Sequence, residues 1–210
     1  YATVVVESPD STVAEQLQQL AIVDSVKWIW KGNLRVPAEE KGEDRFVPED
    51  EPRCNEYGYA HKQIKMLNGT KLHEAGFQGE GMRVAVIDAG FMNADRISAF
   101  DSLRLLGTHN VVFPGKSVFV GDDHGTKVLS CLAADIPGVM VGTAPKASYL
   151  LLKSEDSDSE YPVEEDYWTA AVEYADSAGV DVISSSLGYF AFDADELSYE
   201  QAALDGKTAM

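Results

Sequence analysis

The chain has 210 residues, of which 45% are hydrophobic and 25% charged, a globular composition that excludes fibrous and wholly disordered proteins. This length allows one good-sized domain or two small ones. With 17 basic and 35 acidic residues the net charge is −18, so we expect no nucleic acid as a partner, because such a surface repels phosphates. No apolar run approaches the roughly 18 residues of a membrane span, so no membrane insertion is expected.

Residues 1–36 are expected to form a small strand–helix–strand unit. Residues 4–6 (Val-Val-Val) favour a strand, and Thr12 with Glu15 matches a capping box that would begin a short helix. Residues 26–30 alternate with two tryptophans on one face, which predicts a second strand. A unit of this size is too small to be stable alone, so we expect it to pack on another part of the protein.

Residues 37–56 hold three prolines and eight acidic residues, which indicates a linker. Residues 57–76 predict a helical stretch that Gly76 ends. Its expected packing residues are Ile64, Met66, Leu67 and Leu72.

After the linker, residues 57–210 alternate between helices and strands. Strands are expected at residues 83–87, 111–120, 148–152 and 180–184, and helices at 124–134, 163–178 and, only beginning there, 207–210. This alternation predicts an α/β fold, a mostly parallel sheet with helices on both faces. Because the chain stops where a helix begins, we expect the domain to be truncated.

Two cysteines are too few for a disulfide framework and lack the spacing of metal ligands. Cys131 lies in an apolar stretch and is expected to be a buried thiol, whereas Cys54 lies in the charged linker. A disulfide bridge between Cys54 and Cys131 is an alternative that the sequence does not decide.

Two residues stand where chemistry gathers in a parallel sheet. Asp88 ends an apolar strand, and Gly90 lets the backbone turn there; an aspartate at this place can also simply cap a turn. His124 begins a helix, where we expect it to project outward with a lowered pKa, or to bond a local group. As a pair, Asp88 would orient the imidazole and His124 would activate a hydroxyl as general base.

Two other types of site use the same residues or the same strand end. A metal hydrolase would use Asp88, Asp122, Asp123 and His124 as ligands, but a second histidine at ligand spacing is missing. A nucleotide-binding domain would need a Gly-x-Gly-x-x-Gly turn after the first strand, and residues 88–93 read Asp-Ala-Gly-Phe-Met-Asn instead.

Four segments together resemble the subtilisin-like serine proteases. They are residues 84–90 (Val-Ala-Val-Ile-Asp-Ala-Gly), 123–128 (Asp-His-Gly-Thr-Lys-Val), 142–145 (Gly-Thr-Ala-Pro) and 186–188 (Ser-Leu-Gly). The resemblance covers residues 57–210 and implies a subtilisin-like fold and a secreted, cell-surface or periplasmic serine endopeptidase that cleaves proteins or peptides by acyl transfer. Residues 1–36 resemble the end of a propeptide that docks on the catalytic domain.

The resemblance assigns roles to residues. Asp88 would be the orienting acid and His124 the general acid and base. Ser186, Leu187 and Gly188 would pair with the substrate backbone and border the pocket for the residue before the scissile bond. No cofactor is required; the family often binds calcium, but no ligand set can be matched here.

The chain departs from the family pattern in several places. Lys127 replaces a second histidine, and Ala89 stands where serine or threonine is frequent. The nucleophilic serine, in a Gly-Thr-Ser context, and the oxyanion asparagine are expected downstream, in the remaining C-terminal part of the same protein. The fragment alone would then be inactive, and a pseudoprotease that only binds partners remains the alternative.

Acidic residues gather at 154–160 and 164–166. We expect a solvated loop followed by favourable charges at a helix N-terminus. Alternatively, these acids favour basic side chains in the substrate.

Overall fold

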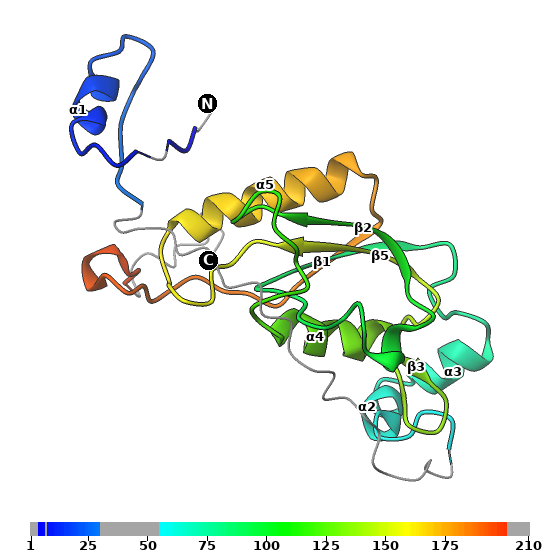
Figure 1. The fold of residues 1–210 in the computed structure, drawn as a ribbon. Coiled ribbons are helices and arrows are strands. Elements are labelled where there is room, and N and C mark those ends of the chain that lie inside the picture. Colours follow the sequence, from blue (N-terminus) through cyan, green and yellow to red (C-terminus); the bar gives the residue numbers. More distant parts are fainter. Residues whose placement is uncertain (1–3, 7, 30–54, 201–210) are drawn as a thin grey trace.

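The computed structural model describes residues 4–6, 8–29 and 55–200, and its main feature is a parallel sheet of four strands (Figure 1). The strands are β1 (Arg83–Asp88), β2 (Arg104–Asn110), β5 (Ser148–Lys153) and β6 (Val182–Ser185), in the order β2-β5-β1-β6. All three pairings are parallel. β1 is therefore central, and its carboxyl end lies between those of β5 and β6.

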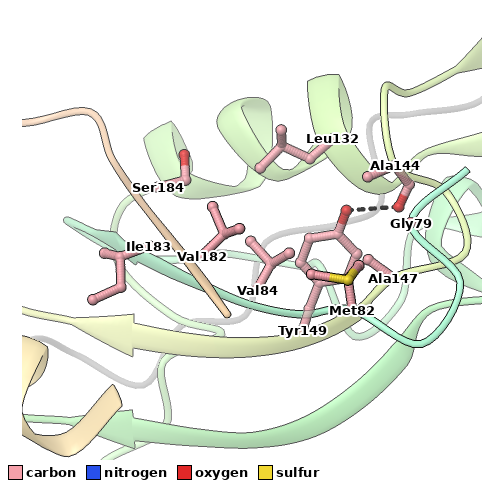
Figure 2. A pocket seen from close by; sticks show the side chains of 10 residues that line it. All are labelled: Gly79, Met82, Val84, Leu132, Ala144, Ala147, Tyr149, Val182, Ile183 and Ser184. Atoms are coloured by element: carbon pink, nitrogen blue, oxygen red, sulfur yellow. Dashed lines mark hydrogen bonds between the residues drawn. The ribbon is translucent and has the colours of Figure 1, made fainter. Parts of the chain in front are cut away.

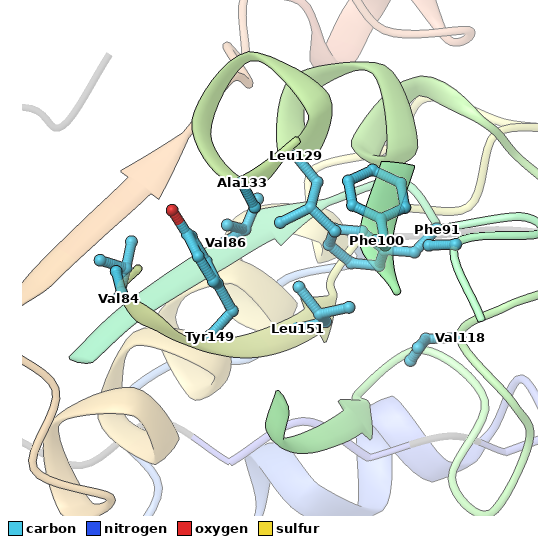
Figure 3. Packing of buried hydrophobic residues seen from close by; sticks show 11 residues of the cluster. Val84, Val86, Phe91, Phe100, Val118, Leu129, Ala133, Tyr149 and Leu151 are labelled. Atoms are coloured by element: carbon cyan, nitrogen blue, oxygen red, sulfur yellow. The ribbon is translucent and has the colours of Figure 1, made fainter. Parts of the chain in front are cut away.

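One long helix covers each face of the sheet, which confirms the predicted α/β class (Figure 1). α4 (His124–Ala133) packs on one face and α5 (Val163–Ser177) on the other. Because successive strand residues point to opposite faces, Val86 and Leu151 pack under α4 while Ala85 and Leu152 pack under α5. Figure 3 shows Leu129 of α4 against the first of these layers.

The predicted helical stretch at 57–76 is two short helices, α2 (His61–Met66) and α3 (Gly69–Glu74). Asn68 takes a left-handed conformation, φ 57°, and interrupts the helical rotation between them. Of the expected packing residues, Ile64 is buried, but Met66, Leu67 and Leu72 are exposed, so that part of the prediction is wrong. Gly76, at φ 92°, ends α3 as predicted.

The strand expected at 111–120 is absent, and the real strand, β2, precedes it. Residues 111–120 form turns whose apolar side chains, such as Val118 and Phe113, are nevertheless buried. Leu105 and Leu106 of β2 are more than 40% exposed. The apolar pattern of residues 111–120 therefore predicted the burial of Val118 and Phe113 correctly, but it did not predict the backbone conformation there.

The small elements are α1 (Val13–Gln18), the 3₁₀ turns η1 (Ser98–Phe100) and η2 (Asp195–Leu197), and an antiparallel pair of β3 (Asp135–Ile136) and β4 (Met140–Val141). Within the described residues, no helix is long and apolar enough to cross a bilayer.

The N-terminal unit keeps its helix but not its strands. Residues 4–6 and 22–29 are not strands in the structure. The capping box is also wrong, because the Thr12 hydroxyl donates to Asp10 Oδ1 at 2.9 Å and caps no helical N–H. The linker residues 37–54, Cys54 and residues 207–210 lie outside the described residues, and the propeptide-like character of residues 1–36 stays a prediction.

Candidate active site

Asp88 and His124, separate in sequence, meet at the carboxyl end of the central strand. His124 Nδ1 lies 2.7 Å from Asp88 Oδ1, which also accepts the Ala89 N–H at 2.8 Å. Asp88 is fully buried, and its Oδ2 has no hydrogen-bond partner among the described residues. A carboxylate can only accept, so Nδ1 carries the proton and Nε2, across the ring, is left as the acceptor.

Two glycines let the two elements approach this closely. A Cβ on Gly125 would lie 2.5 Å from the carbonyl oxygen of Gly90 and 2.9 Å from the Cβ of Asp88. A Cβ on Gly90 would lie 2.8 Å from the Asp122 carbonyl oxygen. Because both contacts are shorter than real Cβ contacts, the site requires glycine at both positions.

His124 projects from the start of α4 as predicted, with 51% of its side chain exposed. Its expected pKa shift is wrong in direction. The hydrogen bond to Asp88, together with that residue's charge, raises the pKa of His124 above its usual 6.5. Burial raises the pKa of Asp88, opposed by the hydrogen bonds from His124 and Ala89.

The residues considered as metal ligands do not form a ligand set. Asp122 Oδ1 accepts the backbone N–H of His124 at 2.7 Å. Asp123 pairs with Lys127 at 2.7 Å, one helical turn away. In the part of the chain that the structure describes, no group of three or more His, Cys, Asp or Glu residues is arranged to hold a metal ion.

Ser186, Leu187 and Gly188, here called the 186–188 segment, continue directly from β6. Since Ile87 is in register with Ser185, the segment begins beside Asp88 at the same edge of the sheet. Ser186 and Gly188 are exposed, and Leu187 packs against the α5 layer. Among the described residues, β6 pairs with β1 alone.

The prediction of a solvated loop is wrong for Glu155, which is only 7% exposed. Glu164 lies in the first turn of α5 as expected, but it is only 2% exposed. Tyr189 donates its hydroxyl to Glu155 Oε1 at 2.5 Å. Burial raises the pKa of Glu155 to about 7 and that of Glu164 to about 9. Tyr189 directly follows the Ser-Leu-Gly motif, but almost no local signal points to a contact with a glutamate 34 positions earlier.

Lys153, at the end of β5, is a buried amine whose burial the sequence did not predict. Its Nζ donates to the carbonyl oxygen of Ala89, next to Asp88. Burial lowers the pKa of this amine.

Cys131, expected to be buried, is exposed. It lies two residues from both Leu129 and Ala133, which face the sheet, and two residues turn a helix by roughly 200°. Its thiol therefore lies on the solvent side of α4.

An apolar pocket lies beside β6 on the α4 face of the sheet (Figure 2). Its walls include Val84, Leu132 and Val182, and Tyr149, whose hydroxyl donates to the carbonyl oxygen of Ala144 at 2.8 Å. Neither Asp88 nor His124 lines it, so the pocket is separate from the acid–base pair.

Comparison with known proteins finds relatives among the subtilisins. The chain is 31% identical over 128 residues to subtilisin E of Bacillus subtilis (strain 168), a match covering 60% of this chain and 32% of that protein. It is 28% identical over 126 residues to a thermostable alkaline protease of Halalkalibacterium halodurans, covering 60% of this chain and 33% of the other. The chain thus spans about a third of the length of these relatives. No family model matches it.

Among solved structures, the MycP3 protease from the type VII (ESX-3) secretion system superposes with a TM-score of 0.47 at 21% identity, over 67% of this chain and 39% of that one. MycP1 with its N-terminal propeptide removed gives a TM-score of 0.45 at 22% identity, over 60% and 36% of the two chains.

Proposed function

Because the chain is related to the subtilisin-like serine proteases, we propose that it carries the acid–base pair and a substrate-binding edge of a serine endopeptidase. One observation carries the proposal: the 2.7 Å contact between Asp88 Oδ1 and His124 Nδ1, which leaves Nε2 as a free base on a half-exposed ring.

In this proposal, His124 Nε2 takes the proton of a serine hydroxyl while the serine oxygen attacks the carbonyl carbon of the scissile bond. The same nitrogen then returns that proton to the leaving amine, and water hydrolyses the acyl-enzyme by the same steps. Asp88 holds the tautomer and stabilises the imidazolium that forms. The family resemblance puts the serine and the oxyanion asparagine downstream of Met210, in the remaining part of the same protein.

The 186–188 segment would bind the substrate by backbone pairing. An extended peptide gains main-chain hydrogen bonds when it joins an open sheet edge, and side-chain pockets then supply specificity. The exposure of Ser186 and Gly188 beside Asp88 supports this role.

The wider setting follows from the family. We propose a secreted, cell-surface or periplasmic protease of protein or peptide substrates, with residues 1–36 as a propeptide docked on the catalytic domain and residues 37–56 as the linker. The net charge of −18 favours a protein that stays dispersed and has no nucleic-acid partner. The proposed chemistry requires no cofactor.

Labelling the longest natural form of the protein with a tagged fluorophosphonate, followed by peptide mass spectrometry, tests the proposal. We expect one labelled serine beyond Met210, and loss of the label in His124→Ala. His61→Ala is the matched control, because His61 begins α2, outside the sheet, and should leave the label intact.

Folded protein without a label would contradict the proposal and favour the pseudoprotease. A label that persists in His124→Ala would remove His124 from the role of base.

A further inference from the structure

The residues on either side of the 186–188 segment, Ser185 and Tyr189, are each held by a side-chain hydrogen bond, and we call these two bonds its anchors. On its N-terminal side, Trp168 Nε1 of α5 donates to Ser185 Oγ at 2.9 Å. On its C-terminal side, the Tyr189 hydroxyl donates to Glu155 Oε1 at 2.5 Å and lies 3.3 Å from the carbonyl oxygen of Glu164. The segment's own exposed residues, in contrast, lie outside the packed core.

The Tyr189 anchor is built on the strand end that also supports Asp88. Glu155 follows Ser154, whose N–H donates to the Asp88 carbonyl oxygen at 3.1 Å and whose hydroxyl donates to Glu155 Oε1 at 3.0 Å. Glu164 Oε1 accepts the Asp156 N–H at 2.9 Å and so holds the intervening loop. The end of β5, the start of α5 and the residue that follows the 186–188 segment therefore meet at the Tyr189 hydroxyl.

Burying the Glu155 carboxyl group is unfavourable in itself. Glu155 is 7% exposed, and a buried carboxyl costs free energy that hydrogen bonds only partly return. Groups buried at such a cost are enriched where geometry serves function.

We propose that Glu155, acting through Tyr189, is a positioning residue that holds the 186–188 segment in the extended geometry needed to pair with the substrate backbone. This inference rests on the proposed function, which assigns the substrate to that segment. Without the anchor, the segment would have to be ordered when the substrate binds, and ordering a residue costs free energy. Binding of extended peptides would weaken, whereas the reacting atoms at His124 would be unaffected.

The structure supplies a matched control for the tyrosine. Tyr199 also donates to a glutamate of α5, Glu165 Oε1 at 2.6 Å, but it is not attached to the 186–188 segment. Tyr199→Phe therefore removes a comparable hydrogen bond without loosening the segment. Glu155→Gln keeps an oxygen acceptor for Tyr189 and serves as the conservative rescue of Glu155→Ala.

Two readouts on the full natural protein test the inference. The first is kcat and KM for an extended peptide substrate. The second is the ¹⁵N order parameters of the Leu187 and Gly188 amides, which report motion on the ps–ns timescale whether or not the protein is active. For Tyr189→Phe and Glu155→Ala we expect KM to rise about tenfold with kcat nearly unchanged, and the order parameters to fall from about 0.85 toward 0.6. Tyr199→Phe and Glu155→Gln should stay near wild type.

The inference is overturned if Tyr189→Phe matches Tyr199→Phe in both readouts, or if kcat alone falls while KM and the order parameters hold. A wild-type protein that cleaves no peptide would instead contradict the proposed function. In that case the order parameters alone decide whether Glu155 and Tyr189 hold the segment.

Discussion

A single proton, the one on His124 Nδ1, determines what the acid–base pair can do. Asp88 accepts it at 2.7 Å and raises the pKa of the imidazole, so we expect His124 to titrate above 6.5 in the natural protein. Because the pKa is raised by folding, the stability that protonated His124 contributes is present below pH 6.5 and is lost as pH rises through the folded-state pKa.

Titration of the His124 ring by NMR measures this shift. In Asp88→Asn the carboxylate charge is gone, so the pKa should drop relative to wild type. The exposed pair of Asp123 and Lys127 offers the control, since Asp123→Asn removes a nearby charge without touching the ring's hydrogen bond. An unchanged titration in Asp88→Asn would contradict the assigned contact.

Glu164 makes a separate prediction about stability and pH. Burial raises its pKa from 4.5 to about 9, so between these values the folded protein binds more protons than the unfolded one. Stability must then fall as pH rises through this window, by at most ~1.4 kcal/mol per pH unit per proton. Glu164→Gln keeps the acceptor for the Asp156 N–H but cannot ionise, so its free energy of unfolding should exceed that of wild type at pH 8.5.

Urea unfolding at pH 6 and pH 8.5 checks this expectation. Glu173→Gln on the exposed face of α5 is the control and should keep the wild-type slope with pH. The same loss of stability with pH in Glu164→Gln as in wild type would show that Glu164 ionises freely in the folded protein.

At the scale of elements, the sequence predicts those helices and strands whose apolar residues follow a regular local pattern. β1, β5, α4 and α5 were correctly expected, because their apolar residues repeat with the period of a buried strand or of an amphipathic helix. Asp88 and His124 were found because each stands at the end of such an element. β2 was misplaced, since its exposed Leu105 and Leu106 carry no burial pattern. The Glu155–Tyr189 contact joins residues 34 positions apart and leaves almost no local signal.

The junction of β1 and α4 yields an element-scale prediction. Gly125→Ala would put a Cβ 2.5 Å from the Gly90 carbonyl oxygen, so the strand end and the helix must separate. We expect a loss of about 1–3 kcal/mol in the free energy of unfolding, together with loss of fluorophosphonate labelling, since Asp88 and His124 move apart.

Chemical unfolding and labelling of the same preparations test this. Gly107→Ala is the matched control, because a Cβ there would meet only Leu150 Cδ1 at an ordinary 3.7 Å. Wild-type labelling in Gly125→Ala would mean that the close approach is not needed for the site.

For the whole molecule, we expect the sheet topology to slow folding. β1 pairs with β5 and β6, both of which follow it only after long intervening segments, so non-local contacts must form before the core can be buried. A docked unit that templates the sheet would lower this barrier. We therefore expect the natural protein without residues 1–36 to refold more slowly and with lower yield than the protein that retains them.

Adding residues 1–36 as a separate peptide tests whether they assist folding by docking on the rest of the protein, without a covalent link to it. Refolding after dilution from denaturant is followed by recovery of the fluorophosphonate label and by circular dichroism. The peptide added in trans should restore both rate and yield, whereas a scrambled peptide of the same composition should restore neither, because charge alone cannot template strand pairing. If the shortened protein refolds as fast and as completely as the longer one, residues 1–36 do not assist folding, and their assignment as a propeptide is wrong.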